Sequence, residues 1–473
     1  MTLKARITAI DRFIKGCRED GIYDDLNACC VMAGWDSLAG ALTPLKGGAL
    51  TNSGFLAADF DRGIGLKGNG STKRLSQVNT ATPLQNSAHQ AIYLSVNSAI
   101  AAPSLPTHIA EWPTSGSDGR TQIDTNTSQT FTRCRETTGS YIGSTSIGVI
   151  GISRSDSADY VRRVGQASET ITETSTGIPA QVVYVFNNSS GSYSDATLAF
   201  YSIGTSLDLA LLDARVSTLM ADLRAIEEAG FDRDAIAYIR AVEEADGGAY
   251  LETSVKIAVN NLVSGLKADG LWDAIGSSCL LCGPRTLAGA LVPLRGAAPT
   301  AYGFVDGDFD RQGLTGDGTS YLDSNRANNA DPQDSKHFAV YAATATSAFG
   351  VYVGSQFDSV IYRSGSPDLL TRINRGTPFT AVSGAAGATG FLAANRPSLG
   401  VTQARAAGTT VTENLDAVRY ISDNALIFAT VSSGVVTAIS DASLAFYSIG
   451  SSLDLAKLDS HISDYVTAIG AAI

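Results

Sequence analysis

Apolar residues recur at helical spacing near the start of each half of the chain. The first half has Ile7, Ile10, Phe13, Ile14 and Cys17, and the second half has Val255, Val259, Leu262, Val263 and Leu266. Residues three or four apart share one face of a helix, so each set predicts an amphipathic helix. Gly21 and Gly270 follow these sets and fit the left-handed position that commonly ends a helix.

The pattern then changes to short runs rich in β-branched and aromatic residues, separated by Gly, Ser, Thr, Asn and Asp. These runs lie at residues 91–96, 181–186, 338–343, 360–364 and 425–431. Such composition predicts strands joined by turns. Many short strands without alternating helices favour a two-layer antiparallel sandwich over βαβ units.

Long stretches of the first half recur in the second half in the same order. Residues 38–62 match 287–311 without a gap, and residues 198–213 match 444–459 with two differences. The chain of 473 residues is therefore predicted to be mainly β, with two tandem antiparallel β-sandwich domains flanked by short helices. We place the domains at residues 1–226 and 251–473, joined by a helical linker over 227–250.

The repeated phrase "LAFYSIG" closes each domain and predicts a final strand that ends at a glycine. Thr205 with Asp208, and Ser451 with Asp454, then fit a capping box that starts a helix with one apolar stripe. We interpret the phrase as scaffold at the closing edge of a duplicated domain.

Charge and composition limit the classes of partner that the protein is expected to bind. The formal net charge of −12 repels phosphate backbones, and the sequence has no compensating cluster of Lys and Arg, so nucleic acid and anionic membranes are not expected partners. The sequence begins without a secretory signal peptide and contains no apolar run of bilayer length. Synthesis in the cytoplasm without membrane insertion is predicted.

Cysteine usage gives one ambiguous motif. The spacing of Cys279 and Cys282 is that of a metal or redox CxxC pair, but no second pair and no nearby His accompany it. The surrounding run is apolar, so two small buried hydrophobic residues are the favoured interpretation.

No catalytic motif of a known mechanism is present, and the histidines number four. The sharpest chemical pattern is an acidic cluster, Asp306, Asp308, Asp310 and Asp317, which has oxygen ligands at a spacing similar to a calcium loop. Arg311 stands where such a loop needs glycine, so an Asp-rich turn with Arg62 or Arg311 pairing is the alternative. No other cofactor is predicted.

Three further residues are weak candidates for carbohydrate binding. His89 and His337 occupy the same place in the two copies, at a strand start, where an edge hydrogen bond is the structural alternative. Trp112 lies in a loop-like segment without a close counterpart, and its ring could stack on a sugar or anchor the loop.

The chain resembles the laminin-G-like, concanavalin A-like jelly-roll modules of structural proteins from tailed phages and phage-derived particles. The resemblance lies in residues 270–283, 313–332, 152–155 and 444–462, and both copies show it. It implies β-sandwiches on a particle surface, commonly homo-oligomeric, which contact other virion proteins such as capsid, portal or tail and sometimes host glycans.

Three functional hypotheses follow. The first is a non-enzymatic virion component, a fibre, spike or decoration protein on the particle surface that contacts host cell-surface polysaccharide. The second is a polysaccharide depolymerase on the same fold, although no strand shows paired carboxylates on one face. The third is a calcium-dependent lectin or adhesin.

Overall fold

A computed structural model describes residues 3–78, 84–112, 119–143, 145–178, 182–417 and 421–473. The chain divides into two compact units, Met1–Gly230 and Phe231–Ile473. Among the described residues, no helix is long and apolar enough to cross a membrane.

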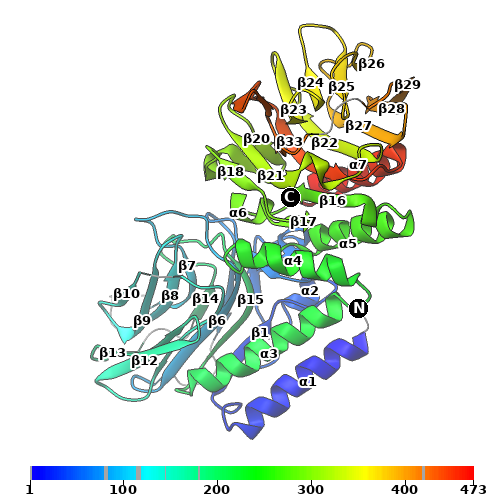
Figure 1. Cartoon of the computed structure of the whole chain (residues 1–473). Helices are drawn as coiled ribbons and strands as arrows, with labels where there is room; N and C mark the ends of the chain where they lie inside the picture. The colour runs from blue at the N-terminus through cyan, green and yellow to red at the C-terminus, as the bar shows by residue number, and fades with distance from the viewer. Residues whose placement is uncertain (1–2, 79–83, 113–118, 144, 179–181, 418–420) are drawn as a thin grey trace. The chain divides into compact units, whose positions relative to one another are not determined.

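Unit one contains two antiparallel sheets (Figure 1). Its inner sheet runs in the order β13 (Ala167–Thr172), β12 (Asp159–Val164), β11 (Gly148–Arg154), β6 (Ala88–Val96), β15 (Thr197–Gly204), β4 (Gly65–Lys67) and β3 (Phe60–Asp61), and β1 (Leu26–Val31) also pairs with β15. Its outer sheet runs β10 (Ser140–Ile142), β9 (Thr130–Glu136), β8 (Arg120–Thr125), β7 (Thr107–Glu111), β14 (Val182–Val185), β5 (Arg74–Val78) and β2 (Thr51–Ser53).

Unit two repeats this arrangement. Its inner sheet runs β17 (Pro293–Arg295), β16 (Ile275–Leu280), β33 (Ser443–Gly450), β22 (Lys336–Thr344), β27 (Gly390–Ser398), β28 (Val401–Ala406) and β29 (Thr409–Asn414), with β20 (Gly313–Thr315) pairing β33 and β19 (Phe309–Asp310) pairing β20. Its outer sheet runs β18 (Thr300–Tyr302), β21 (Tyr321–Ala327), β30 (Asn424–Ile427), β23 (Gly350–Ser355), β24 (Ser359–Arg363), β25 (Leu369–Arg372) and β26 (Thr380–Val382). A hairpin of β31 (Thr430–Ser432) and β32 (Val435–Thr437) lies beside it.

Helices form a third layer against each inner sheet. Unit one has α1 (Leu3–Glu19) and α3 (Leu209–Glu227), with the short α2 (Leu38–Ala41) after β1. Unit two has α4 (Arg233–Ala245), α5 (Thr253–Ala268) and α7 (Leu455–Ala472), with the short α6 (Leu287–Ala290) after β16. In unit one the rings of Phe13 on α1 and Phe200 on β15 meet edge to face, 5.9 Å apart. Each unit is therefore a layered stack of helices, inner sheet and outer sheet.

Two apolar cores hold unit two together. One packs the helices on the inner sheet and includes Leu262, Phe446 and Ile462; the other fills the space between the two sheets and includes Val340, Ile361 and Ile427. Alternate residues of each inner strand enter one core or the other, because side chains along a strand point to opposite faces. Burying both faces explains why the inner strands carry long apolar runs, such as those of β15 and β33.

The predicted mainly β, two-sandwich fold is confirmed, and each predicted strand run overlaps a strand of the structure. The predicted start of the closing helix is wrong by one turn. Asp208 and Asp454 themselves cap α3 and α7, accepting hydrogen bonds from the N–H groups of the second and third residues beyond them. Thr205 instead donates from its hydroxyl to Asp25, at 2.7 Å, because the chain first crosses the end of β1.

The glycines of the repeated phrase are required by a close approach. A Cβ atom on Gly204 would lie 1.7 Å from the carbonyl oxygen of Asp25, and one on Gly450 would lie 2.0 Å from that of Ala274. A larger residue cannot occupy either place without moving backbone, so both copies of the phrase end their strand on glycine.

The predicted linker over 227–250 contains a helix of unit two. The apolar stripe of α4, with Tyr238, Ile239 and Val242, is buried in the same core as α5. The boundary between the units therefore falls at Gly230 and Phe231, before this helix.

Candidate binding faces of the outer sheets

The outer sheet of unit two presents a cluster of aromatic side chains on the face that points away from the sandwich core. We call it the aromatic face and define it by Phe349, Val351, Phe357, Val360, Tyr362, Leu370, Arg372 and Phe379. The strand register places these residues together: Val351 lies opposite Tyr362, Tyr362 opposite Leu370, and Val360 opposite Arg372. The neighbouring row, Val353 and Ile361, points into the core.

The rings of the aromatic face surround Tyr362. Its ring centroid lies 5.2 Å from Phe379, 5.9 Å from Phe349 and 6.2 Å from Phe357. Tyr362 is 5% exposed, whereas Phe349 is 52% exposed and the other two phenylalanines are half-buried. The guanidinium of Arg372 lies 3.4 Å from the centre of the Phe379 ring. Tyr362 is therefore the floor, and the three phenylalanines form the accessible rim.

The same positions in unit one carry different chemistry. The outer sheets have matching bulges, after Val351 in unit two and after Thr107 in unit one. Their registers therefore equate Val351 with Thr107, Val360 with Gln122 and Tyr362 with Asp124. Continuing across the sheet, Leu370 corresponds to Phe131 and Arg372 to Arg133. Two apolar positions and one aromatic position of unit two are thus polar in unit one.

Asp124 is an acid on the unit-one face whose pKa is strongly raised. It is 4% exposed and accepts a hydrogen bond from Nε2 of Gln122 at 2.6 Å. Burial raises the pKa of Asp124 to about 7, although the hydrogen bond from Gln122 and the charge of Arg133 lower it. A carboxylic acid with a pKa near neutrality can take part in acid–base chemistry, so this residue bears on the enzyme hypothesis.

The two histidines proposed for carbohydrate binding are structural. His89 Nδ1 lies 2.6 Å from the carbonyl oxygen of Thr205, and its Nε2 lies 3.2 Å from Oγ of Ser202. His337 makes the equivalent contacts to Ser451, at 2.6 Å, and Ser448, at 2.8 Å.

Both rings are buried, and burial lowers the pKa of each to about 4. They cannot reach a ligand, and the edge-hydrogen-bond interpretation holds. We call this pair the histidine clamp, because each ring fastens the repeated phrase to the neighbouring strand.

Trp112 follows β7 in unit one and is half-buried. Its ring packs against Arg120 of the paired strand β8, whose guanidinium carbon lies 4.0 Å from the ring centre. The segment that follows, residues 113–118, lies outside the described residues. The contact with Arg120 gives Trp112 an anchoring role next to the outer sheet.

The carboxylates of the acidic cluster of unit two are directed to their own turns. Within the described residues, no three side chains of His, Cys, Asp or Glu come together as metal ligands. Asp308 and Asp310 accept hydrogen bonds from the backbone of their own turns. Hydrogen bonds from Thr319 and Ser320 lower the pKa of Asp317 to about 2.

The carboxylates of Asp308, Asp310 and Asp317 close turns, as the interpretation of the cluster as an Asp-rich turn predicts. Arg311 pairs with Glu252, at 2.7 Å, and not with the cluster, so the predicted pairing of that arginine inside the turn is wrong.

Cys279 and Cys282 behave as the favoured interpretation predicts. Both thiols are buried, neither is in a disulfide, and burial raises the pKa of each to about 12. A thiol in this state is a poor nucleophile and a poor metal ligand.

A hollow of about 480 Å³ in unit two lies between the β27–β29 edge and the start of α7. Its polar lining includes Asn395 and Gln403, which bond to each other at 2.9 Å; Asn395 also donates to the carbonyl of Leu453. The equivalent residue of unit one, Ser153, ties down Leu207 in the same way. These side chains are committed to holding the strand-to-helix turn, so the aromatic face is the stronger candidate.

Sequence reasoning missed the aromatic face. Phe349, Phe357 and Phe379 stand in or beside turns, and each taken alone is an ordinary loop residue. Only the register brings them to one surface. The signal that could have found them is the difference between the copies, since the aligned segment of unit one has a different set of residues.

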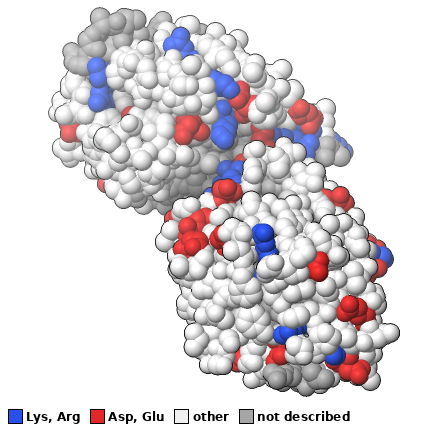
Figure 2. All heavy atoms as spheres, turned by 90° about the horizontal axis from the view of Figure 1, so that it is seen from above, with Lys and Arg blue, Asp and Glu red and all other residues white. Residues whose placement is uncertain are grey.

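The surface charges in Figure 2 do not indicate a different binding face from the aromatic face. On the side of the molecule that Figure 2 shows, acidic and basic side chains are interspersed among uncharged residues. The rim of the aromatic face is formed by uncharged rings, with Arg372 as its cation.

No protein-family model matches the chain, and no curated protein matches its sequence. Among solved structures, it is similar to domains LG4-5 of the mouse laminin α1 chain, with 11% identity over 86% of this chain and 92% of that chain and a TM-score of 0.25. It is also similar to the botulinum neurotoxin serotype D binding domain, with 6% identity over 91% and 99% of the two chains and a TM-score of 0.34.

A third similar structure is the sialidase CBM40 of Ruminococcus gnavus, with 13% identity over 27% of this chain and 82% of that chain and a TM-score of 0.23. TM-scores of this size carry no argument, so the sandwich class stands on the strand order of each unit. The assignment to phage particles stays a prediction.

Proposed function

We propose that this chain is a non-enzymatic structural protein displayed on a phage-like particle, as a fibre, spike or decoration component, and that it binds host cell-surface polysaccharide through the aromatic face of unit two. The observation that carries the binding proposal is the ring cluster around Tyr362, with Phe349 half exposed above it. Exposed apolar patches on soluble proteins mark binding sites.

The chemistry of this face suits a sugar. Aromatic rings offer flat apolar surfaces that match the C–H faces of pyranose rings, and neighbouring rings 5.2–6.2 Å from Tyr362 are spaced on the scale of one monosaccharide. Arg372 donates from Nη1 to the carbonyl of Phe357 at 2.9 Å, and its positive charge beside the rings suits an acidic sugar.

The binding proposal is tested on an array of bacterial surface glycans with the purified full chain. We expect selective binding that Phe349→Ala and Phe379→Ala each weaken at least ten-fold. Leu399→Ala is the matched control, because Leu399 is 71% exposed on unit two but lies in the turn between β27 and β28. Binding that survives both ring variants contradicts the assignment.

The display proposal has a separate test. We expect antibodies against the chain to label isolated particles, and the chain to sediment as a homo-oligomer. Density that places it in a cell-associated complex without particles contradicts the display role but leaves the glycan test standing.

The depolymerase hypothesis has one observation in its favour, the buried Asp124 with its raised pKa. Glycoside hydrolysis needs a second carboxyl group beside the first. The residues paired around Asp124 carry none, but the register also places the buried Glu136, opposite Arg120, on that face. Incubation with the polysaccharide that binds decides the question. New reducing ends that Asp124→Asn abolishes support the enzyme, and an unchanged polymer supports the binding protein.

A further inference from the structure

The first helices of the two units are equivalent, but one of them has a covered flank. Residues 21–24 and 270–273 align, which equates Ile7, Ile10 and Ile14 of α1 with Lys256, Val259 and Val263 of α5. In unit two all three positions are buried. In unit one Ile7 is 56% exposed, and Ile10 and Ile14 are only half-buried.

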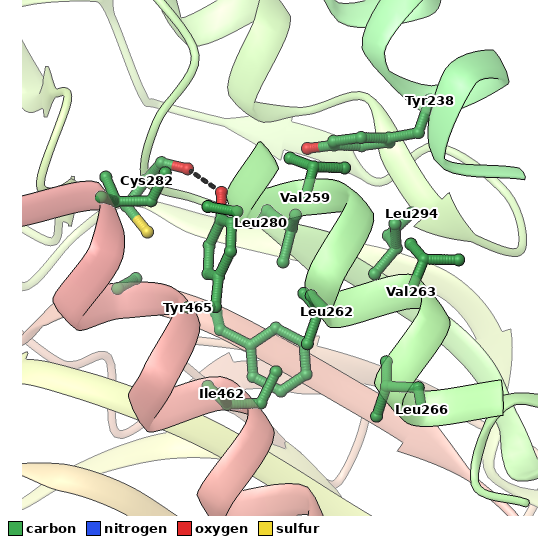
Figure 3. Packing of buried hydrophobic residues seen from close by; sticks show 14 of the residues in the cluster. Tyr238, Val259, Leu262, Val263, Leu266, Leu280, Cys282, Leu294, Ile462 and Tyr465 are labelled. Carbon is green, nitrogen blue, oxygen red and sulfur yellow. Dashed lines mark hydrogen bonds between the residues drawn. The ribbon is translucent and has the colours of Figure 1, made fainter. Parts of the chain in front are cut away.

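The covering element in unit two is α4. It forms an antiparallel hairpin with α5, and Tyr238, Ile239 and Val242 enter one core with Val259 and Val263. Figure 3 shows the ring of Tyr238 lying over Val259. The internal duplication therefore shows what packs on this flank of the helix: a second amphipathic helix.

The apolar flank of α1 has the same form as the covered one. We call it the α1 stripe and define it by Leu3, Ile7, Ile10 and Ile14, at i, i+4, i+7 and i+11. This spacing forms one continuous strip on a helix. It lies on the opposite side of α1 from α3, whose Asp222 bonds to Arg12 and whose Arg215 lies against Gly16.

Charge specifies the partner further. In unit two Lys267 binds the acidic first turn of α4, at 2.6 Å from Asp232 and 2.5 Å from Asp234, and lies over the ring of Trp272. The equivalent residues of unit one are Arg18 and Tyr23, and Arg18 lies over the Tyr23 ring in the same manner, 4.7 Å from its centre. Unit one thus keeps the cation that would receive an acidic first turn.

We propose that the α1 stripe is the docking surface for an amphipathic α-helix of a partner polypeptide that carries acidic residues in its first turn and lies antiparallel to α1. A second copy of α1 fits poorly, because its first turn contains Lys4 and Arg6 and would place like charges near Arg18. Apolar anchors at helical spacing would supply the affinity, and the ion pairs at Arg18 would set the direction.

The test uses the full chain with Ile7→Cys as a reporter. The native cysteines are all buried, so alkylation by a maleimide reports on position 7. In a second version of the chain, residues 231–251 are joined directly to Leu3. Leu3 is equivalent to Glu252, so the added α4 segment precedes α1 as α4 precedes α5. We expect the appended helix to slow alkylation at least ten-fold. The same segment with Ile239→Asp and Val242→Asp should leave the rate unchanged.

Any of three results overturns the proposal. One is an alkylation rate that the intact appended helix does not change, with Ile14→Cys giving the same answer. Another is alkylation as slow in the original chain as at a buried site, because the stripe is then already covered. A chain that sediments as a dimer and that Ile7→Asp makes monomeric also overturns it, since the occupant is then a second copy.

Discussion

The two units keep the same closing structure and differ at their outer surfaces. In both, a buried histidine fastens the repeated phrase, a glycine lets β1 or β16 approach, and an aspartate caps the last helix. On the outer sheets, Thr107, Gln122 and Asp124 of one unit face Val351, Val360 and Tyr362 of the other in the alignment. The two copies thus keep the residues that close the fold and differ in the chemistry of the outer sheet.

Replacing a glycine of the repeated phrase should give the largest difference in stability between the two units. Gly450→Ala places a Cβ 2.0 Å from a backbone carbonyl, and we expect unit two to lose about 4 kcal/mol or more of stability. Hydrogen exchange followed by mass spectrometry should show this loss in unit two alone. Gly470→Ala is the control: it lies in α7 with open space around it and should be neutral or slightly stabilising.

The histidine clamp predicts loss of stability in acid. Both rings have a pKa of about 4 in the folded chain against 6.5 when unfolded, so the fold favours the neutral ring. Their contribution is complete above pH 6.5 and is lost as the pH falls towards 4, on the order of 3 kcal/mol per ring. Denaturant titrations at pH 7 and pH 4.5 check this, and His337→Gln should flatten the response of unit two. If His337→Gln leaves the loss of stability between pH 7 and pH 4.5 unchanged, the proposed role of the histidine clamp is contradicted.

The ionisation of Asp124 lowers the stability of unit one as the pH rises, which is opposite to the effect of the histidines. Its pKa is about 7 when folded and 3.8 when unfolded, so ionisation destabilises the fold, and the penalty grows as the pH rises through this range. We expect Asp124→Asn to stabilise unit one by about 4 kcal/mol at pH 8 and to have little effect at pH 4. Tyr362→Phe, at the equivalent position of unit two, should show no such dependence on pH. Equal effects at both pH values for Asp124→Asn would contradict the assignment.

The smallest predicted effect is one that the two units share. Arg163 bonds to Asp213 at 2.7 Å, and Arg405 bonds to Asp459 at 2.8 Å, each tying a strand hairpin to the closing helix. We expect Arg163→Met and Arg405→Met to cost about 1 kcal/mol each and to cost less at high salt. A difference of several-fold between the two variants would mean that the scaffold has also diverged.

The sequence predicts the fold well, because each element is specified locally. Apolar residues at helical spacing mark α1 and α5, and the two copies of the repeated phrase mark β15 and β33. Self-similarity supplies the domain count. The start of the closing helices was misplaced by one turn, because Thr205 and Asp208 both fit a cap and only the contact with Asp25 distinguishes them.

The candidate site could not be predicted in the same way. His89 and His337 share a place that the alignment reveals, but whether a ring faces solvent or Ser202 depends on the packing of strands far apart in sequence. Phe349, Phe357 and Phe379 become one surface only through the pairing of β23, β24 and β25. The carboxylates at Asp308 and Asp310 have suitable spacing for a metal, and their turns direct them to backbone N–H groups instead.

The central claim is that glycan binding belongs to unit two and was not inherited by both copies. The most direct test is the stoichiometry of a short oligosaccharide, taken from the array, in isothermal titration with the full chain. The account predicts one ligand per chain, lost in Phe349→Ala and kept in Tyr141→Ala, which alters the exposed ring of the unit-one face. Two ligands per chain, or one that persists in Phe349→Ala, would contradict it.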